Sequence, residues 1–216
     1  MRRISCYACV VLVCTLFSGL PASASDLGAV SPAAGAKASV SNTSPVKMAE
    51  GFIHALTQEG IGFLGDSSMS DEARKRAFKK LLNKNFDMKT LARFSLGRYW
   101  RTASEDQRKE YMSLFQKMII EVYSKRFSDY KGQKVEIKAS RTEGNNGDIL
   151  VNSVILQKNA PEIQLDWRVR FKNGEFKVVD VIVEGVSMAV TQRSDFASVI
   201  QRGGGDINVL LAHLRQ

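Results

Sequence analysis

Residues 161–190, PEIQLDWRVRFKNGEFKVVDVIVEGVSMAV, decide the fold, because they predict a β-hairpin that runs directly into a helix. Apolar and polar side chains alternate along the first strand, which is the period-two pattern of a half-buried strand. Asn173-Gly174 supplies the two residues that a tight type I′ turn prefers. The return strand is predicted over residues 175–183. The apolar positions of the first strand are Ile163, Leu165, Trp167, Val169 and Phe171.

The two-residue turn predicts the register of the hairpin. If Lys172 pairs with Glu175, then Trp167 lies opposite Asp180 on the apolar face, and Arg168 lies on the other face. The return strand carries valines on that other face as well, so we expect it to be covered on both faces. Asp180 is then either a buried acid with a raised pKa or a structural acceptor for the Trp167 indole, an arginine or a backbone amide. The structural interpretation is preferred.

The N-terminus has the pattern of an export signal. Arg2 and Arg3 precede an apolar segment that ends at Leu20, and the small residues 22–24 follow it. This pattern predicts a signal peptide over residues 1–24, with an uncleaved membrane anchor as the alternative. All three cysteines lie inside it, so the mature chain is predicted to lack disulfides and cysteine-based metal sites. Residues 25–44, rich in Ala, Ser and Gly, are predicted to form a disordered linker.

The chain is basic, with a formal net charge of +9, and it stays basic without Arg2 and Arg3. For an exported protein this charge favours an anionic membrane surface or an acidic protein over nucleic acid. Arg76, Lys80 and Lys84 repeat at every fourth residue of a predicted helix. They form either a solvated face or a stripe on which an acidic partner docks.

The order of predicted elements indicates an α+β fold. Four helices precede a four-stranded antiparallel meander, and two helices follow it, so that the sheet is packed by N-terminal and C-terminal helices. Ser104 and Gln107 have the spacing of a capping box and begin the longest predicted helix, which runs to about Tyr130. The helices are predicted from 45 to between 60 and 65, from 70 or 71, from 88, from 105 to about 130, from 188 to about 201 and from 207, and the strands over 135–139, 149–158, 163–172 and 175–183.

Catalytic patterns are sparse. His54 and His213 are the only histidines, and the common metalloprotease, nucleotide-binding and hydrolase motifs are missing from the sequence. Asp180 and Glu184 would lie about 13 Å apart on a strand, too far for a glycosidase pair. The protein is therefore predicted not to be an enzyme. The alternative is a small isomerase or hydratase with Asp180 as its base and a tyrosine, Tyr111 or Tyr123, as a second polar group.

Two segments resemble the MlaC family, also called the toluene-tolerance or ABC-transporter auxiliary family, and the similarity extends from about Pro45 to Leu214. In the C-terminal segment the resemblance rests on Asp180, Glu184-Gly185-Val186-Ser187-Met188, Gln192, Phe196 and Gly204. In the middle segment it rests on Leu96-Gly97, Trp100, Ser104, Gln107-Arg108 and Phe115.

The resemblance implies a periplasmic phospholipid carrier, with residues 45–216 as the lipid-binding domain. It implies that the carrier shuttles lipid between an outer-membrane lipoprotein–porin complex and an inner-membrane ABC transporter complex with an MCE-domain subunit. It also implies an NTF2-like character, with a deep apolar pocket between sheet and helices. A hopanoid-type lipid is the alternative cargo. No cofactor, metal or catalytic residue is implied, and a monomer is expected.

The residues that line this pocket are predicted from the apolar faces of the strands and of the helix that begins at residue 105. Each buried CH₂ of a lipid tail contributes about 0.8 kcal/mol, so a pocket for tails needs many apolar side chains and few polar ones. The predicted lining consists of Phe94, Tyr111, Leu114, Met118, Val122, Val151, Ile155, Leu165, Trp167, Val169, Phe171, Val181 and Met188.

Overall fold

The computed structural model describes residues 44–144 and 146–216. The predicted signal peptide, the three cysteines and all of the predicted linker except Ser44 lie outside these residues. Among the described helices, none is long and apolar enough to cross a membrane. The elements are α2 (Pro45–Gly65), α3 (Asp71–Asn85), α4 (Met88–Leu96), α5 (Tyr99–Thr102), α6 (Glu105–Ser124), η2 (Phe127–Asp129), β1 (Lys134–Glu143), β2 (Asp148–Leu156), β3 (Ile163–Lys172), β4 (Glu175–Val183), β5 (Val186–Ser187), α7 (Met188–Arg202) and α8 (Ile207–Arg215).

Side-chain caps begin the six predicted helices, whereas the short helix α5 was not predicted and has no side-chain cap. Ser44, followed by Pro45, caps α2, and the capping box of Ser104 and Gln107 at the start of α6 is confirmed. The prediction that α6 runs to about Tyr130 is wrong, because the helix ends at Ser124 and a 3₁₀ turn, η2, follows. From that turn the ring of Phe127 packs edge-on against Phe78, with the ring centroids 5.4 Å apart.

Five strands of the described chain form one antiparallel sheet in the order β1-β2-β3-β4-β5. The sequence predicted four of them. The fifth exists because Glu184 and Gly185 adopt φ values of 49° and 77°, which make a tight turn. Val186 and Ser187 therefore pair back with Val183 and Ile182 before α7 begins.

The predicted register of the β3–β4 hairpin holds only near its turn. Asn173 and Gly174 have positive φ as expected, and the pairing continues as predicted down to Val169 opposite Val178. A β-bulge follows, after which Arg168 pairs with Asp180 and Trp167 pairs with Val181. The predicted pairing of Trp167 with Asp180 is therefore wrong, because the extra residue moves every later side chain of β4 to the opposite face.

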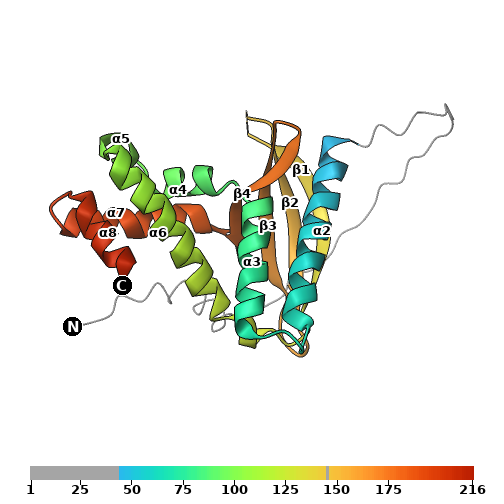
Figure 1. Ribbon diagram of the computed structural model, residues 1–216. Coiled ribbons are helices and arrows are strands. Elements are labelled where there is room, and N and C mark those ends of the chain that lie inside the picture. Colours follow the sequence, from blue (N-terminus) through green and yellow to red (C-terminus); the bar gives the residue numbers. More distant parts are fainter. Residues whose placement is uncertain (1–43, 145) are drawn as a thin grey trace, which may run out of the picture. The chain divides into compact units, whose positions relative to one another are not determined.

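Two groups of helices pack on the sheet, and they meet where α6 lies against α3 (Figure 1). On the face that carries Trp167 and Val169, here called the apolar face, α2 packs over β1 and β2, and α3 packs beside β4. On the face that carries Arg168 and Arg170, here called the arginine face, α4 and α7 pack against β4. The expectation that β4 is covered on both faces is confirmed.

Two hydrophobic clusters result from this arrangement. The sheet cluster consists of Ala49, Ile53, Leu56, Leu81, Ile149, Val151, Trp167, Val169 and Val178. The helical cluster, built by α4 to α8, consists of Ala92, Leu96, Tyr99, Ala103, Tyr111, Phe115, Phe196, Ile200, Ile207, Leu210 and Leu211. A small domain usually has one contiguous core with minor satellites, so two clusters of similar size are notable.

Candidate functional site

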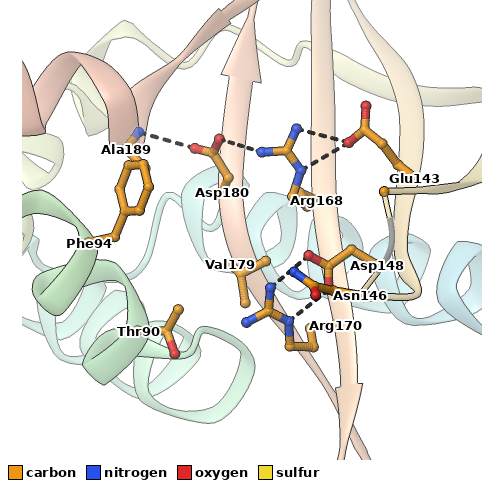
Figure 2. Close-up of a pocket in the computed structure, with 11 residues that line it drawn as sticks. Thr90, Phe94, Glu143, Asn146, Asp148, Arg168, Arg170, Val179, Asp180 and Ala189 are labelled. Carbon is orange, nitrogen blue, oxygen red and sulfur yellow. Dashed lines mark hydrogen bonds and ion pairs between the residues drawn. The ribbon is translucent and has the colours of Figure 1, made fainter.

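A cleft of about 320 Å³ opens on the arginine face, where α4 and α7 meet the sheet (Figure 2). Strand alternation sends Arg168 and Arg170 of β3 into it, and the bulge in β4 turns Asp180 toward the same side. The cleft is lined by Thr90, Phe94, Glu143, Gly144, Asn146, Asp148, Arg168, Arg170, Val179, Asp180 and Ala189.

Asp180 joins three segments of the chain at one end of this cleft. One carboxylate oxygen accepts a hydrogen bond from the Ala189 amide at 3.1 Å, and the other accepts one from the Ser187 hydroxyl at 2.6 Å. The second oxygen also lies 3.3 Å from Nη1 of Arg168, whose Nε donates to Glu143 at 3.0 Å. The carboxylate therefore ties the start of α7 to β3 and, through the arginine, to the end of β1.

Arg170 forms the other ion pair of the cleft. Its Nε and Nη2 each donate to an oxygen of Asp148 at 2.7 Å, which is a bidentate pair. Asp148 raises the pKa of Arg170 further above its already high value through this hydrogen bond. Both arginines of the cleft are thus neutralised, and its three carboxylates outnumber its two guanidinium groups. The cleft braces the sheet and does not present free positive charge.

This geometry does not support general-base chemistry by Asp180. The side chain is 3% exposed, and both its oxygens already accept hydrogen bonds. The two tyrosines named as a second polar group are not among the residues that line the cleft. Tyr111 is fully buried in the helical cluster, where its hydroxyl donates to the Ala92 carbonyl and burial raises its pKa. Asp180 is the structural acceptor of the preferred interpretation, although the Trp167 indole donates to Ser153 instead.

The predicted lining residues do not lie in one place. Trp167, Val151 and Val169 are buried in the sheet cluster, where their side chains form core. Tyr111 is core of the helical cluster. The exposed members are Phe94, which lines the polar cleft, Val122 on α6, and Phe171 near the hairpin turn.

The remaining members are half-buried at the edges of the two clusters. Leu165 and Val181 pack against the sheet cluster, and Leu114 and Met118 pack against the helical cluster. Ile155 and Met188 are half-buried as well. Alternation along strands and helices found the apolar faces but could not separate core positions from half-exposed ones. The deep apolar pocket therefore remains a prediction.

A second cavity, of about 400 Å³, lies between α3 and α6, and we call it the α3–α6 groove. The sequence pattern does not predict it, because its lining is mainly polar and charged and cannot be distinguished in sequence from a solvated helix face. Of the predicted basic stripe, Arg76 lines the groove, whereas Lys84 lies 3.4 Å from Glu59 of α2. The groove is lined by Glu72, Lys75, Arg76, Lys79, Ser113, Gln116, Lys117, Ile120 and Glu121.

Metal chemistry has no support in the part of the chain that the structure describes. Among residues 44–144 and 146–216, no group of three or more His, Cys, Asp or Glu side chains could hold an ion.

Comparison with known proteins gives consistent matches. The family profile described as "MlaC protein" matches residues 55–216. The chain is 30% identical over 124 residues to the intermembrane phospholipid transport system binding protein MlaC of Haemophilus influenzae, covering 56% of this chain and 57% of that protein. It is 22% identical over 111 residues to the toluene tolerance protein ttg2D of Pseudomonas putida, covering 51% of each. The chain thus spans little more than half the length of these relatives.

The fold also matches a solved structure. A phospholipid-binding protein from Ralstonia solanacearum, solved in complex with a phospholipid, superposes with a TM-score of 0.66. The two chains are 23% identical, and the match covers 77% of this chain and 94% of the other. At this identity the likeness shows that the two proteins share their fold.

Proposed function

The chain belongs to the MlaC family, and from that premise we propose that it is a periplasmic phospholipid carrier. The family match over residues 55–216 carries the proposal, because it spans almost all of the described chain. The Haemophilus influenzae relative is named for intermembrane phospholipid transport, and the structural neighbour was solved with a phospholipid bound. These names favour a phospholipid over a hopanoid-type cargo.

The proposed route and partners are those that the resemblance to the family implies. The carrier takes lipid from one membrane complex and delivers it to another, with an outer-membrane lipoprotein–porin complex and an inner-membrane ABC transporter with an MCE-domain subunit as its partners. A carrier of this kind must cover the acyl chains from water while it crosses the periplasm. Each CH₂ that it buries contributes about 0.8 kcal/mol, so the binding energy comes from apolar area.

The acyl chains are proposed to bind along the edges of the two hydrophobic clusters. Leu165 and Val181 on the apolar face, and Met118 and Leu114 on α6, are apolar yet only half-buried. Two clusters that are not merged into one core can separate to admit a chain between them more readily than a single core can. Methionine suits such a surface, since its flexible side chain adapts to different acyl chains.

Asp180, the base of the enzymatic alternative, is already engaged as a hydrogen-bond acceptor. Asp180 would have to release the Ala189 amide or the Ser187 hydroxyl before it could take a proton from a substrate. We therefore propose no reaction for this chain.

The test is to purify the full chain from the periplasm without detergent and to determine its mass by native mass spectrometry, followed by lipid extraction. We expect a complex heavier than the chain by one or more phospholipids. A mass that corresponds to the bare chain after gentle purification would contradict the proposal.

The lining is tested by introducing a charge at a half-buried position. Leu165→Glu or Met118→Glu should abolish the lipid load while the circular dichroism spectrum stays that of a folded protein. Val190→Glu is the matched control, because Val190 is 55% exposed and lies outside the proposed lining. Val151 is not suitable for this test, since it is fully buried and a charge there would unfold the core. A full lipid load in both lining variants would overturn the assignment.

A further inference from the structure

We propose that the α3–α6 groove binds a phosphate-bearing anion, namely the headgroup phosphate of the cargo lipid. The identity of the anion as a lipid headgroup rests on the proposed function. The prediction that the groove binds an anion rests only on the charged residues that line it. Its walls come from two helices that belong to different halves of the fold. Helix α3 packs on the sheet, and α6 is part of the helical cluster.

The groove has a surplus of positive charge. Four cationic side chains line it, and they are Lys75, Arg76, Lys79 and Lys117. Only two carboxylates, Glu72 and Glu121, line it with them, so its net charge is +2. The ion pair in the groove joins Lys75 to Glu121, and the Lys75 ammonium lowers the pKa of that carboxyl.

Among the described residues, the other three cations form no ion pair with a carboxylate, although the Lys117 ammonium also helps to lower the pKa of Glu121. Arg76 and Lys79 stand on α3, and Lys117 stands opposite them on α6. Like charges on facing helices repel one another, and because all three side chains are exposed to water the repulsion is modest. An anion bound between the helices would turn this repulsion into attraction.

The groove also offers the hydrogen-bonding groups that an anion needs. The Ser113 hydroxyl and the Gln116 amide lie on the same wall as Lys117, and the amide is held in place by a hydrogen bond to Asn83 of α3. Lysine, arginine and hydroxyl donors are the usual partners of phosphate groups. Ile120, which is 7% exposed, closes the wall beneath them.

The position of the groove suits a headgroup. Leu114, a proposed contact of the acyl chains, lies three residues before Lys117 on α6, so the two side chains are neighbours on the helix surface. A phosphate held at Lys117 would thus lie within one helical turn of apolar side chains that can receive the tails. A volume of about 400 Å³ falls in the range of small-ligand sites, which favours a headgroup over a segment of an acidic protein.

The experiment compares the wild type with a variant that carries Arg76→Gln, Lys79→Gln and Lys117→Gln. The control carries Lys80→Gln, Lys89→Gln and Lys134→Gln, which are exposed lysines outside the groove with the same total change of charge. Each delipidated protein is loaded from vesicles that contain equal amounts of phosphatidylglycerol and a neutral diacylglycerol, and the bound lipids are quantified by mass spectrometry. Inorganic phosphate is titrated separately by NMR.

We expect the wild type and the control to prefer phosphatidylglycerol about tenfold more than the groove variant does, a factor worth about 1.4 kcal/mol. Equal preference in all three proteins, with normal loading, would overturn the inference and leave the carrier function intact. No loading of any protein would instead count against the carrier function. If no protein loads lipid, chemical-shift changes confined to groove residues during the phosphate titration would support the groove as a site for free phosphate. The absence of such changes would overturn the inference that the groove binds phosphate.

Discussion

Asp180 shows how one buried carboxylate organises a large part of this fold. It accepts hydrogen bonds from the Ala189 amide and the Ser187 hydroxyl, and it contacts Arg168 on the neighbouring strand. Ser187 is also the N-cap of α7, so the direction in which that helix leaves the sheet depends on this carboxylate. The enzymatic alternative required Asp180 to act as a general base. Its contacts show that it acts instead as a hydrogen-bond acceptor that holds the fold together.

Replacing Asp180 with Ala should therefore lower stability. The buried Ala189 amide and the part-buried donors of Ser187 and Arg168 would each lose a partner, and we expect a loss of about 1–3 kcal/mol in the free energy of unfolding. Urea denaturation followed by circular dichroism measures the change. Glu175→Gln on the exposed hairpin is the control, with an effect within about 0.5 kcal/mol. A fully stable Asp180→Ala variant would contradict the bracing role.

Asp87 gives a pH-dependent contribution at the start of α4. Partial burial raises the pKa of its carboxyl, but hydrogen bonds from the Thr90 hydroxyl and amide outweigh this, so the pKa lies below its usual value. A folded-state pKa below that of the unfolded chain stabilises the protein above about pH 3.9, and the contribution is lost as the pH falls through the folded value.

Asp87→Ala should cost about 1 kcal/mol at pH 7, because the N-cap is lost, and clearly less at pH 3. Urea denaturation at the two pH values measures the difference from wild type. Asp87→Asn is the matched variant, since asparagine still caps a helix but cannot titrate, and it should retain most of the stability at pH 7. An equal loss for Asp87→Ala at both pH values would show that the charge is irrelevant.

At the scale of elements, the β3–β4 hairpin separates what local sequence can predict from what it cannot. The Asn173-Gly174 turn was predictable, because it depends on two residues that tolerate positive φ. The bulge beyond Val178 was not, because Asp180 reaches Ser187 and Ala189 only when β4 carries one extra residue. Alternation could not distinguish core from half-buried positions among the predicted lining residues for a related reason. Leu165 and Val169 share a face of β3, yet only the packing of α2 and α3 makes one half-buried and the other core.

The turn between β4 and β5, like the Asn173-Gly174 turn, depends on a residue that tolerates positive φ. Gly185 has a φ of 77°, and no atom lies close to where a Cβ would be, so a substitution would be strained only through the backbone. Gly185→Ala should cost about 1–2 kcal/mol. Gly185→Asn should cost less, because asparagine tolerates the left-handed region. Thermal denaturation of both variants measures this, and equal losses would contradict a purely backbone effect.

At the scale of the whole chain, a lipid bound along the two hydrophobic clusters should stabilise the folded protein. A ligand that binds only the folded state adds about 2.7 kcal/mol when its free concentration is a hundred times Kd. The delipidated protein should therefore melt at a lower temperature than the loaded protein, and addition of phospholipid should restore the difference. Scanning calorimetry measures both states. Identical melting temperatures would mean that bound lipid contributes nothing to the folded state.

The two hydrophobic clusters also give the protein two separate optical reporters. The sequence holds two tryptophans, Trp167 in the sheet cluster and Trp100 against the helical cluster, where the Arg108 guanidinium lies 5.6 Å from its ring. Fluorescence of Trp100→Phe and Trp167→Phe variants would follow each half of the fold alone. Because β4 packs directly on α4 and α7, we expect the two emission changes to share one denaturation midpoint. Lipid uptake, by contrast, is expected to change the emission intensity or wavelength of the two indoles to different extents. Time-resolved mixing of each variant with lipid would then show which half of the fold responds first.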